Sequence, residues 1–419
     1  MLDIQFIRDN KEKVVRAAKN KNNKIDVEAI LILDGKRRDL MIEVQTLREE
    51  RNKHSKTKPT QDAIKAGKEI KEKIHALEIK LKKVEDEFNR ALITIPNIPS
   101  NDVPIGKDDS ENVEIRKWGT PRKYDFVPLD HVELGESLDV IDIKRASKVS
   151  GSRFAYLKNE LVLMEFALVQ LSLSVLIKEG FSAVIPPTLI KKEITESLGY
   201  WHGADNEEYY WVNEENVEDK GLYLIGTAEH AVVPYFSNET LHEKDMPKRF
   251  VAFSSCFRRE AGSYGKDVRG ILRVHQFDKV EMVSFTTPEK GIEEHEYFLS
   301  LEEKLFQMLE IPYRVLRMCT GDLGFPAARK YDIEAWIPSQ DKYREVTSTS
   351  TTTDFQSRRL NIKYSDGKNV GYAHIINGTA FAIGRTLIAI MENYQQKDGS
   401  IKVPKVLMSY VGFEKISLK

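Results

Sequence analysis

Cysteine is nearly missing from this chain of 419 residues, which contains only Cys256 and Cys319. The two do not form a C-x-x-C pair, so neither the ligand spacing of a zinc site nor a disulfide framework is present. Such a low cysteine content is typical of the reducing cytosol, and the sequence shows no signal-peptide pattern. We therefore expect a cytoplasmic protein that binds no zinc.

An excess of charge and a clear membrane span are also missing. The formal net charge is -1, so binding of a nucleic acid requires a local basic surface. One apolar stretch, residues 161–177, is slightly short for a membrane span and contains Glu165 and Gln170 together with two serines. We expect a buried core helix at this stretch and no association with a membrane.

Neither the P-loop motif nor the G-x-G-x-x-G fingerprint occurs, so a bound nucleotide would need another kind of phosphate site. Residues 256–282 read as a strand, a glycine-containing loop and a second strand, with Phe277 as an aromatic face for stacking. Their basic residues are Arg258, Arg259, Lys266, Arg269 and Arg273, apart from one further lysine. Arginine suits bidentate contact with phosphate. From charge spacing alone, a triphosphate site and a basic surface hairpin fit this segment equally.

The first hundred residues contain heptad repeats. Apolar residues recur between 33 and 47, and between 70 and 95 they follow alternating steps of four and three. Pro59 and Thr60 interrupt the repeats, which predicts two helices joined by a short turn in an antiparallel coiled-coil hairpin. About 32 residues per helix would give a rod of about 48 Å.

The tip of the predicted hairpin is basic. Between residues 51 and 73, eight lysines and arginines stand against three acidic residues, a local charge of +5. The basic residues are Arg51, Lys53, Lys56, Lys58, Lys65, Lys68, Lys71 and Lys73. Such clusters bind phosphate backbones through counterion release. A solvated coiled-coil face or a dimerisation rod has the same composition, so charge alone leaves these alternatives open.

A proline-rich linker with Pro96, Pro99 and Pro104 follows the heptads. Beyond it, short β-branched and aromatic runs alternate with longer helical stretches. We therefore predict an N-terminal domain over residues 1–104. We predict a second domain over residues 105–419, of the α+β class, with a mostly antiparallel sheet.

The 256–282 segment resembles motif 2 of class II aminoacyl-tRNA synthetases, and specifically the seryl type. Its FRREAG start and RVHQFDKVEM end carry the likeness. Other matching segments are the T-x-E at 227–229, TGDLGF at 320–325, DFQ at 354–356, residues 377–379 with 384–385 as motif 3, and residues 180–187 as motif 1. The basic hairpin matches the tRNA-binding arm of the family. The resemblance to the seryl-tRNA synthetases thus covers nearly the whole chain.

The resemblance implies an ATP site. Its residues would be Arg258, Arg259, Glu260, Arg273, Phe277, Glu345, Val346, Thr347, Ser348 and Arg385. Arg258 would hold the α-phosphate, and Arg273 and Arg385 would clamp the outer phosphates. Glu345 and Ser348 would bind Mg²⁺. The implied catalytic residues are Arg258, Glu345 and Arg385.

The resemblance also implies a serine site next to the adenine. Phe277 would stack on the adenine ring, which Glu260 would face. The serine-binding residues would be Thr227, Ala228, Glu229, Glu281, Asn377 and Thr379. Glu229 would meet the amino group, and Glu281 and Thr379 would receive the hydroxyl. In the basic hairpin, tRNA would contact Arg51, Lys53, Lys65, Lys68 and Lys71.

The implied activity is that of a serine–tRNA ligase. Serine and ATP would form seryl-adenylate, and the seryl group would pass to the 3′ end of tRNA(Ser) and also of tRNA(Sec). The family resemblance further implies a homodimer that assembles through motif 1. A non-catalytic paralogue that binds tRNA or ATP is the alternative, but such relatives usually lose a motif arginine or the Mg²⁺ carboxylate. This chain keeps Arg258, Arg385, Glu345 and Glu281.

The sequence departs from the family pattern after Glu345. It reads VTSTSTTTDFQ, where the family usually has Ser-Ser-Cys-Ser-Asn before its DFQ. Thr347, Thr349 and Thr351 are therefore unusual, and we expect the packing of this pocket wall to differ. Ser348 is retained, so Mg²⁺ binding should survive. Without zinc, rejection of threonine as a substrate would be mostly steric.

Overall fold

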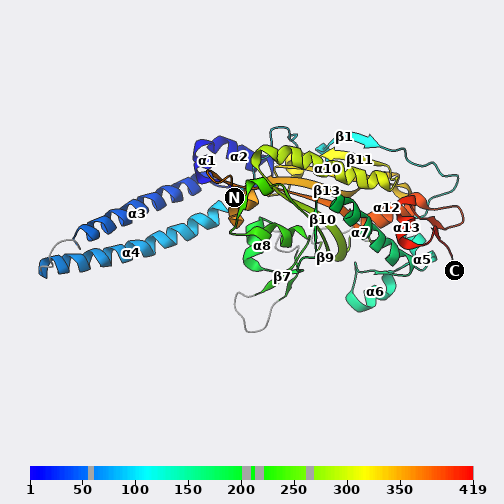
Figure 1. Cartoon of the computed structure of the whole chain (residues 1–419), viewed down its shortest axis with the longest axis horizontal. Helices are drawn as coiled ribbons and strands as arrows, with labels where there is room; N and C mark the ends of the chain where they lie inside the picture. The colour runs from blue at the N-terminus through cyan, green and yellow to red at the C-terminus, as the bar shows by residue number, and fades with distance from the viewer. Residues whose placement is uncertain (55–60, 201–208, 213–220, 261–268, 419) are drawn as a thin grey trace. The chain divides into compact units, whose positions relative to one another are not determined.

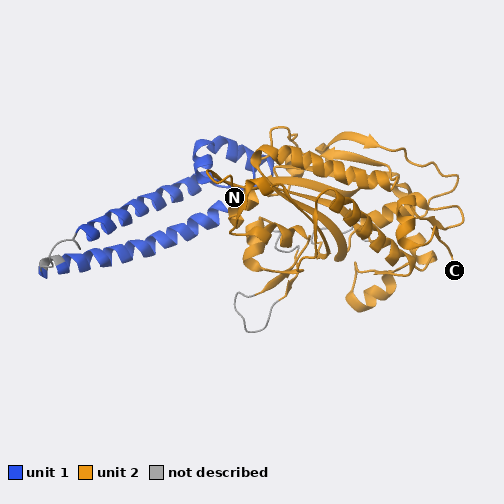
Figure 2. Cartoon of the chain, in the orientation of Figure 1, with its two compact units in different colours: residues 1–98 blue, residues 99–419 orange. Residues whose placement is uncertain are grey.

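The computed structural model describes residues 1–54, 61–200, 209–212, 221–260 and 269–418 (Figure 1). Contacts divide the chain into two compact units, residues 1–98 and residues 99–419 (Figure 2). The linker after residue 98 is bonded to the second unit, because the backbone N–H of Ser100 donates to the carbonyl of Ala328. The assignment of separate functions to residues 1–104 and 105–419 stays a prediction.

The first unit is helical. It contains α1 (Ile4–Asp9), α2 (Lys11–Asn20), α3 (Val27–His54) and α4 (Gln61–Leu92). The two long helices lie antiparallel, and the seam residues Val44, Ile70, Ile74 and Phe88 are buried (Figure 1). The predicted coiled-coil hairpin is therefore confirmed. The 32 residues of α4 span about 48 Å.

A buried acid fixes the base of the hairpin. Asp34 lies on α3 with a side chain only 2% exposed, and it binds Arg8 of α1 at 2.8 Å and Arg37 at 3.1 Å. A buried carboxylate is costly unless it is paired and hydrogen-bonded. The cluster thus ties α1 to α3, and the guanidinium of Arg37 also lies over the Phe88 ring of α4.

An eight-stranded sheet forms the centre of the second unit, in the order β1-β11-β12-β13-β16-β10-β9-β4. Only β4 and β9 pair in parallel; the other neighbours pair antiparallel. The bounds are β1 Val113–Trp118, β4 Ser182–Val184, β9 Lys248–Phe257, β10 Gln276–Thr286, β11 Tyr313–Arg317, β12 Arg329–Ile337, β13 Lys342–Thr353 and β16 His374–Ala382. The predicted α+β class with a mostly antiparallel sheet is confirmed.

Three helices pack against this sheet and share its main hydrophobic core: α7 (Glu160–Lys178), α10 (Gly291–Met308) and α12 (Ile383–Tyr394) (Figure 1). Strand β10 turns Val280 and Met282 into that core. Because successive side chains of a strand point to opposite faces, Lys279 and Glu281 point away from it. The second face of the sheet is therefore free for polar side chains.

Helix α7 covers the stretch that we expected to be a buried core helix. By length and composition it is long and apolar enough to cross a membrane, but such a helix alone is weak evidence for a span. Met164 and Leu168 are buried, whereas Leu163, Phe166 and Ile177 are 49%, 52% and 51% exposed. The expectation of a buried helix is therefore correct for the face with Met164 and Leu168. It is wrong for the face with Leu163, Phe166 and Ile177.

Smaller elements complete the second unit. The further helices are α5 His131–Ser137, α6 Ile143–Ser150, α8 Lys192–Leu198, α9 Glu229–Val232, α11 Phe355–Leu360 and α13 Met408–Val411. The further strands are β2 Ile141–Asp142, β3 Tyr156–Leu157, β5 Leu189–Lys191, β6 Trp211–Val212, β7 Leu222–Leu224, β8 Thr240–His242, β14 Lys363–Ser365, β15 Val370–Tyr372, β17 Ile401–Lys402 and β18 Lys415–Ile416. Residues 225–229, between β7 and α9, matter most for the site. The backbone N–H of Phe257 donates to the carbonyl of Ile225 and so fixes them beside β9.

Candidate active site

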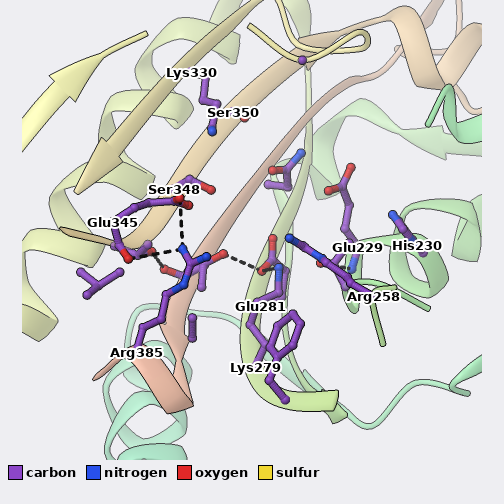
Figure 3. A pocket seen from close by; sticks show the side chains of 18 of the residues that line it. Glu229, His230, Arg258, Lys279, Glu281, Lys330, Glu345, Ser348, Ser350 and Arg385 are labelled. Carbon is purple, nitrogen blue, oxygen red and sulfur yellow. Dashed lines mark hydrogen bonds and ion pairs between the residues drawn. The ribbon is translucent and has the colours of Figure 1, made fainter. Parts of the chain in front are cut away.

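A cleft of about 410 Å³ lies on the polar face of the large sheet. It collects most of the residues that the sequence predicted for ATP, serine and Mg²⁺. These are Thr227, Glu229, Arg258, Glu260, Arg273, Phe277, Glu281, Glu345, Val346, Thr347, Ser348, Asn377, Thr379 and Arg385. Figure 3 shows Glu345 and Arg385 together on one side, Glu229 and Arg258 on the other, and Glu281 between them.

Glu281 is the buried acid at the middle of the cleft. It stands opposite Thr379 in the β10–β16 register, and the Thr379 hydroxyl donates to its Oε2 at 3.0 Å. Lys279 Nζ lies 2.7 Å from the same oxygen, and both side chains of this ion pair are less than a tenth exposed. The carboxylate is thus already held by a cation and a hydroxyl.

Glu229 is a second buried acid, at the start of α9. It accepts hydrogen bonds from the Tyr200 hydroxyl at 2.7 Å and from Gln356 Nε2 at 3.1 Å. Burial and the nearby Glu281 carboxylate raise its pKa. Both bonded partners are neutral, so an incoming ammonium group would find a carboxylate whose charge is not yet compensated.

Arg385 and Glu345 form the opposite end of the cleft. Arg385 Nη1 lies 3.0 Å from Glu345 Oε2 and donates to the Glu345 carbonyl at 3.3 Å. Burial raises the pKa of Glu345, but attraction by Arg385 and Lys330 outweighs it and brings the pKa to about 2. The Glu345 side chain is still 44% exposed, so it remains ionised and accessible to a ligand.

Two arginines, Arg258 and Arg273, line the cleft near the end of β9. Arg258 donates to the carbonyl of Gly226 at 3.1 Å, and its guanidinium lies over the Phe277 ring at 5.4 Å. Arg273 Nη1 lies 3.3 Å from a carboxyl oxygen of Glu260. An aromatic face and two guanidinium groups thus lie close together, which suits a nucleotide base and its phosphates.

Strand β13 explains the unusual threonines. Thr349 and Thr351 are buried, and Thr349 stands opposite Tyr331 of the core, so these two side chains lie on the helix-covered face of the sheet. Thr347 stands opposite Ile333 and is also buried, but it contributes to the lining of the cleft, as Ser348 and Ser350 do. The departure from the family pattern therefore lies partly behind the cleft and, at Thr347, in its wall.

Two predicted site residues lie apart from the cleft. Ala228 is buried at the start of α9, and Arg259 lines a neighbouring cavity with Tyr210 and Trp211. The predicted tRNA-binding residues Arg51, Lys53, Lys65, Lys68 and Lys71 are exposed on α3 and α4. Lys56 and Lys58 of the same basic cluster, and Lys266 of the motif 2 loop, lie outside the described residues.

Sequence reasoning missed several residues that complete the site. Lys279 precedes Glu281 by two positions, so strand alternation alone places both on one face. Lys330 lines the cleft from β12, and Tyr200 and Gln356 reach Glu229 from distant segments. Gln356 belongs to the DFQ segment, but its contact with Glu229 was not predicted, and no local pattern identifies Lys330 or Tyr200, because these roles depend on contacts between elements far apart in the sequence.

A metal ion would find few protein ligands here. Within the described ranges, no group of three or more His, Cys, Asp or Glu residues is placed to hold one. Glu345 and Ser348 offer one carboxylate and one hydroxyl at the cleft. This small set fits Mg²⁺, which typically binds through one or two carboxylates, water and substrate phosphates.

Comparison with known proteins gives consistent matches. The family model of the seryl-tRNA synthetase N-terminal domain matches residues 1–99, and that of the class II tRNA synthetase core domain (G, H, P, S and T) matches residues 210–394. The serine–tRNA ligase of Dictyoglomus thermophilum is 48% identical over 429 residues, with 100% of both chains covered.

Solved structures agree with these matches. The crystal structure of seryl-tRNA synthetase from Pyrococcus horikoshii complexed with ATP has a TM-score of 0.92 and 41% identity, with 100% of both chains covered. The cytoplasmic serine–tRNA ligase of Naegleria fowleri in complex with AMP has a TM-score of 0.89 and 31% identity. That comparison covers 100% of this chain and 99% of the other.

The buried ion pair between Lys279 and Glu281 should stabilise the folded protein. Lys279→Met leaves the Glu281 carboxylate buried without its cation, which should lower the free energy of unfolding by about 3 kcal/mol. Adding Glu281→Gln should restore part of this loss. Lys304→Met is the control, because the Lys304–Glu179 pair is exposed and should contribute less than about 1 kcal/mol. Urea unfolding of the four proteins measures this, and equal losses for both lysines would contradict it.

Proposed function

The chain belongs to the seryl-tRNA synthetase family of class II, and from this we propose how its residues carry out the serine–tRNA ligase reaction. The enzyme activates L-serine with ATP to form seryl-adenylate. It then transfers the seryl group to the 3′ end of tRNA(Ser). The full-length relatives that are serine–tRNA ligases support this activity. The gathering of Glu229, Glu281 and Arg385 in one cleft supports the assignment of residues.

The first step joins serine to the α-phosphate of ATP. The serine carboxylate oxygen attacks the α-phosphorus, a P–O bond to pyrophosphate breaks, and pyrophosphate leaves. The nucleophile is already an anion, so positioning and charge neutralisation contribute more than a general base. Arg258 would hold the α-phosphate, and Arg273 and Arg385 would bind the outer phosphates. Phe277 would stack on the adenine, with Glu260 beside it.

Mg²⁺ would be held by Glu345 and Ser348 together with the phosphates. When bound, it would neutralise charge on the phosphoryl oxygens. Glu345 fits this role because its carboxylate is ionised and open to the cleft. Arg385 holds that carboxylate before any ligand arrives, so the site is oriented in advance.

Serine would be recognised by the two buried acids. Glu229 would bind the ammonium group, with Thr227 beside it. Glu281 and Thr379 would bond the hydroxyl, with Asn377 nearby. A substrate without this hydroxyl leaves buried polar groups unpaired, and sites of this kind reject such analogues strongly. Rejection of threonine would depend on space around the same carboxylate.

The second step transfers the seryl group. A ribose hydroxyl of the terminal adenosine would attack the seryl carbonyl, form the ester and displace AMP. The basic residues of α3 and α4 would bind tRNA through its phosphates. We propose that residues 1–104 serve tRNA and residues 105–419 catalyse. Charging of tRNA(Sec), a cytoplasmic location and the absence of zinc remain part of this proposal.

Activation of serine tests the reaction directly. Pyrophosphate exchange should occur with serine, and far more weakly with alanine or threonine. Glu281→Ala should raise the serine KM or lower the rate by about 5- to 150-fold, because a buried hydrogen bond of about 1–3 kcal/mol is lost. ATP affinity, measured by direct titration, should change little. Equal losses for both ligands would show that Glu281 does not recognise serine.

Removal of the hairpin separates the two functions. The Arg48–Glu78 ion pair and the Arg37–Phe88 contact set the register of α3 and α4, so residues 41 and 85 face each other. Deleting residues 42–84 keeps the buried Asp34 cluster. The variant should retain serine-dependent pyrophosphate exchange and lose tRNA charging. Lys65, Lys68 and Lys71 changed together to Gln should raise the tRNA KM in the full chain. Loss of exchange in a folded deletion variant would refute the division.

The exposed apolar face of α7 supports a homodimer. Leu163, Phe166 and Ile177 are about half exposed there, and Ile185, close to β4, is 85% exposed. Exposed apolar residues of this density are typical of interfaces. Sedimentation at micromolar concentration should give a dimer, and Phe166→Lys should yield monomers. Val149→Lys, at a residue 71% exposed on α6, is the matched control and should remain dimeric.

A further inference from the structure

Glu302 is a carboxyl group buried behind the cleft. It lies on α10 and is 0% exposed, and its oxygens have no partner in regular hydrogen-bond geometry among the described residues, although the Thr347 hydroxyl is near enough to act on them. Other acids of the same helix are paired: Glu294 binds Arg249, and Glu303 binds Arg116. Glu302 has no such cation among the described residues. An unpaired buried acid is costly, so its retention calls for an explanation.

The charged groups around Glu302 are acids. Glu281 of β10, Asp332 of β12 and Glu303 of its own helix all act on it. Burial is the first cause, and these carboxylates the second, that raise its pKa well above the ordinary value. The Thr347 hydroxyl acts in the opposite direction and lowers the pKa of Glu302.

The hydroxyl groups next to Glu302 are bonded to β16. Thr347 Oγ1 donates to the carbonyl of Thr379, and Thr349 Oγ1 donates to the carbonyl of Asn377 at 2.8 Å. The Thr347 hydroxyl is also close enough to act on the Glu302 carboxyl, and this contact lowers the pKa of that carboxyl. Glu302 therefore lies beside a side chain that is bonded to Thr379 of the serine site.

Glu302 also lies beside Gly378 of β16. Gly378 has no side chain, and a Cβ placed there would lie 2.7 Å from Glu302 Oε1 and 3.0 Å from Thr349 Oγ1. The next residue is Thr379, whose hydroxyl donates to Glu281 in the cleft. Glu302 thus lies beside the residue that precedes Thr379, which would bind the serine hydroxyl.

We propose that Glu302 is a positioning residue for the serine site, and that it holds residues 377–379 of β16 through Gly378 and the threonine hydroxyls of β13. The proposal rests on the serine-binding roles given above to Glu281 and Thr379. It also gives Thr347 and Thr349 a function. The family pattern has Ser and Cys at these two positions, and here two threonine hydroxyls meet a buried acid.

Substitution of Glu302 tests the proposal through the serine KM in pyrophosphate exchange. Glu302→Ala should raise this KM about 5-fold or more, because the cavity that it leaves beside Gly378 loosens residues 377–379, with the ATP KM within about twofold. Glu302→Gln keeps the size and polarity of the side chain and should stay within about twofold of the original. Glu303→Gln is the matched control and should not change either KM. Equal effects of Ala and Gln on both substrates would overturn the proposal.

A double-mutant cycle provides an independent test. Gly378→Ala places a Cβ against the Glu302 carboxyl and should raise the serine KM. In the Glu302→Ala background the nearest obstructing atom is gone, while Thr349 Oγ1 and Phe298 remain at 3.0 and 3.1 Å, so the same change should have a smaller effect. Effects that simply multiply would refute the contact. If Glu302→Ala does not fold, Thr347→Val removes only a hydroxyl and should alone raise the serine KM; no change would overturn the proposal.

These outcomes are separable from failure of the proposed function. If the unmodified protein does not exchange pyrophosphate with serine, the reaction itself is misassigned. Suppose instead that the unmodified protein does exchange pyrophosphate with serine. If Glu281→Ala then raises the serine KM but Glu302→Ala does not, the serine site stands and only the role of Glu302 is lost. Thermal unfolding of every variant shows whether a change in KM accompanies a loss of folded protein.

Discussion

Neighbouring side chains of strand β10 point to opposite faces of the sheet, and the arrangement of the cleft depends on this alternation. Val280 and Met282 face the helices, while Lys279 and Glu281 face the cleft. A shift of the register by one residue would bury two charges in the core and expose two apolar side chains. The pairing of Glu281 with Thr379 requires the observed register, and the Lys279–Glu281 ion pair requires that both residues lie on the same face of β10. The fold of the sheet and the chemistry of the cleft are therefore fixed together.

The buried acids of this unit are stabilised in different ways. Glu281 has a cation and a hydroxyl, whereas Glu229 has two neutral donors and a raised pKa. Glu302 has no cation among the described residues, and burial together with the neighbouring acids raises its pKa well above the ordinary value. These environments suit different tasks. A carboxylate with neutral partners can take up a cationic substrate group, while an acid buried away from the cleft can only hold its surroundings.

The features that were predictable from the sequence depend on local patterns. Heptad spacing predicted the hairpin of α3 and α4. The motif arginines Arg258 and Arg385 both line the cleft, as expected. Arg259 follows Arg258 directly, yet it lines a different cavity, because neighbouring residues of an extended chain point to opposite sides. The contact of Tyr200 with Glu229 and that of Glu302 with Gly378 join distant segments. Such contacts have no signature in a single sequence.

The missing side chain at Gly378 constrains how this protein can change over time. The space that a Cβ would fill is already taken by Glu302 and Thr349, which come from two other elements. Positions 302 and 378 therefore cannot vary independently. A substitution that shortens residue 302 removes the nearest of these atoms and leaves a larger residue at 378 less obstructed, although Thr349 and Phe298 still limit its size. In the reverse order, a larger residue at 378 would first have to displace the Glu302 carboxyl. The order in which substitutions become acceptable along this strand thus depends on contacts that α10 and β13 make with one backbone position.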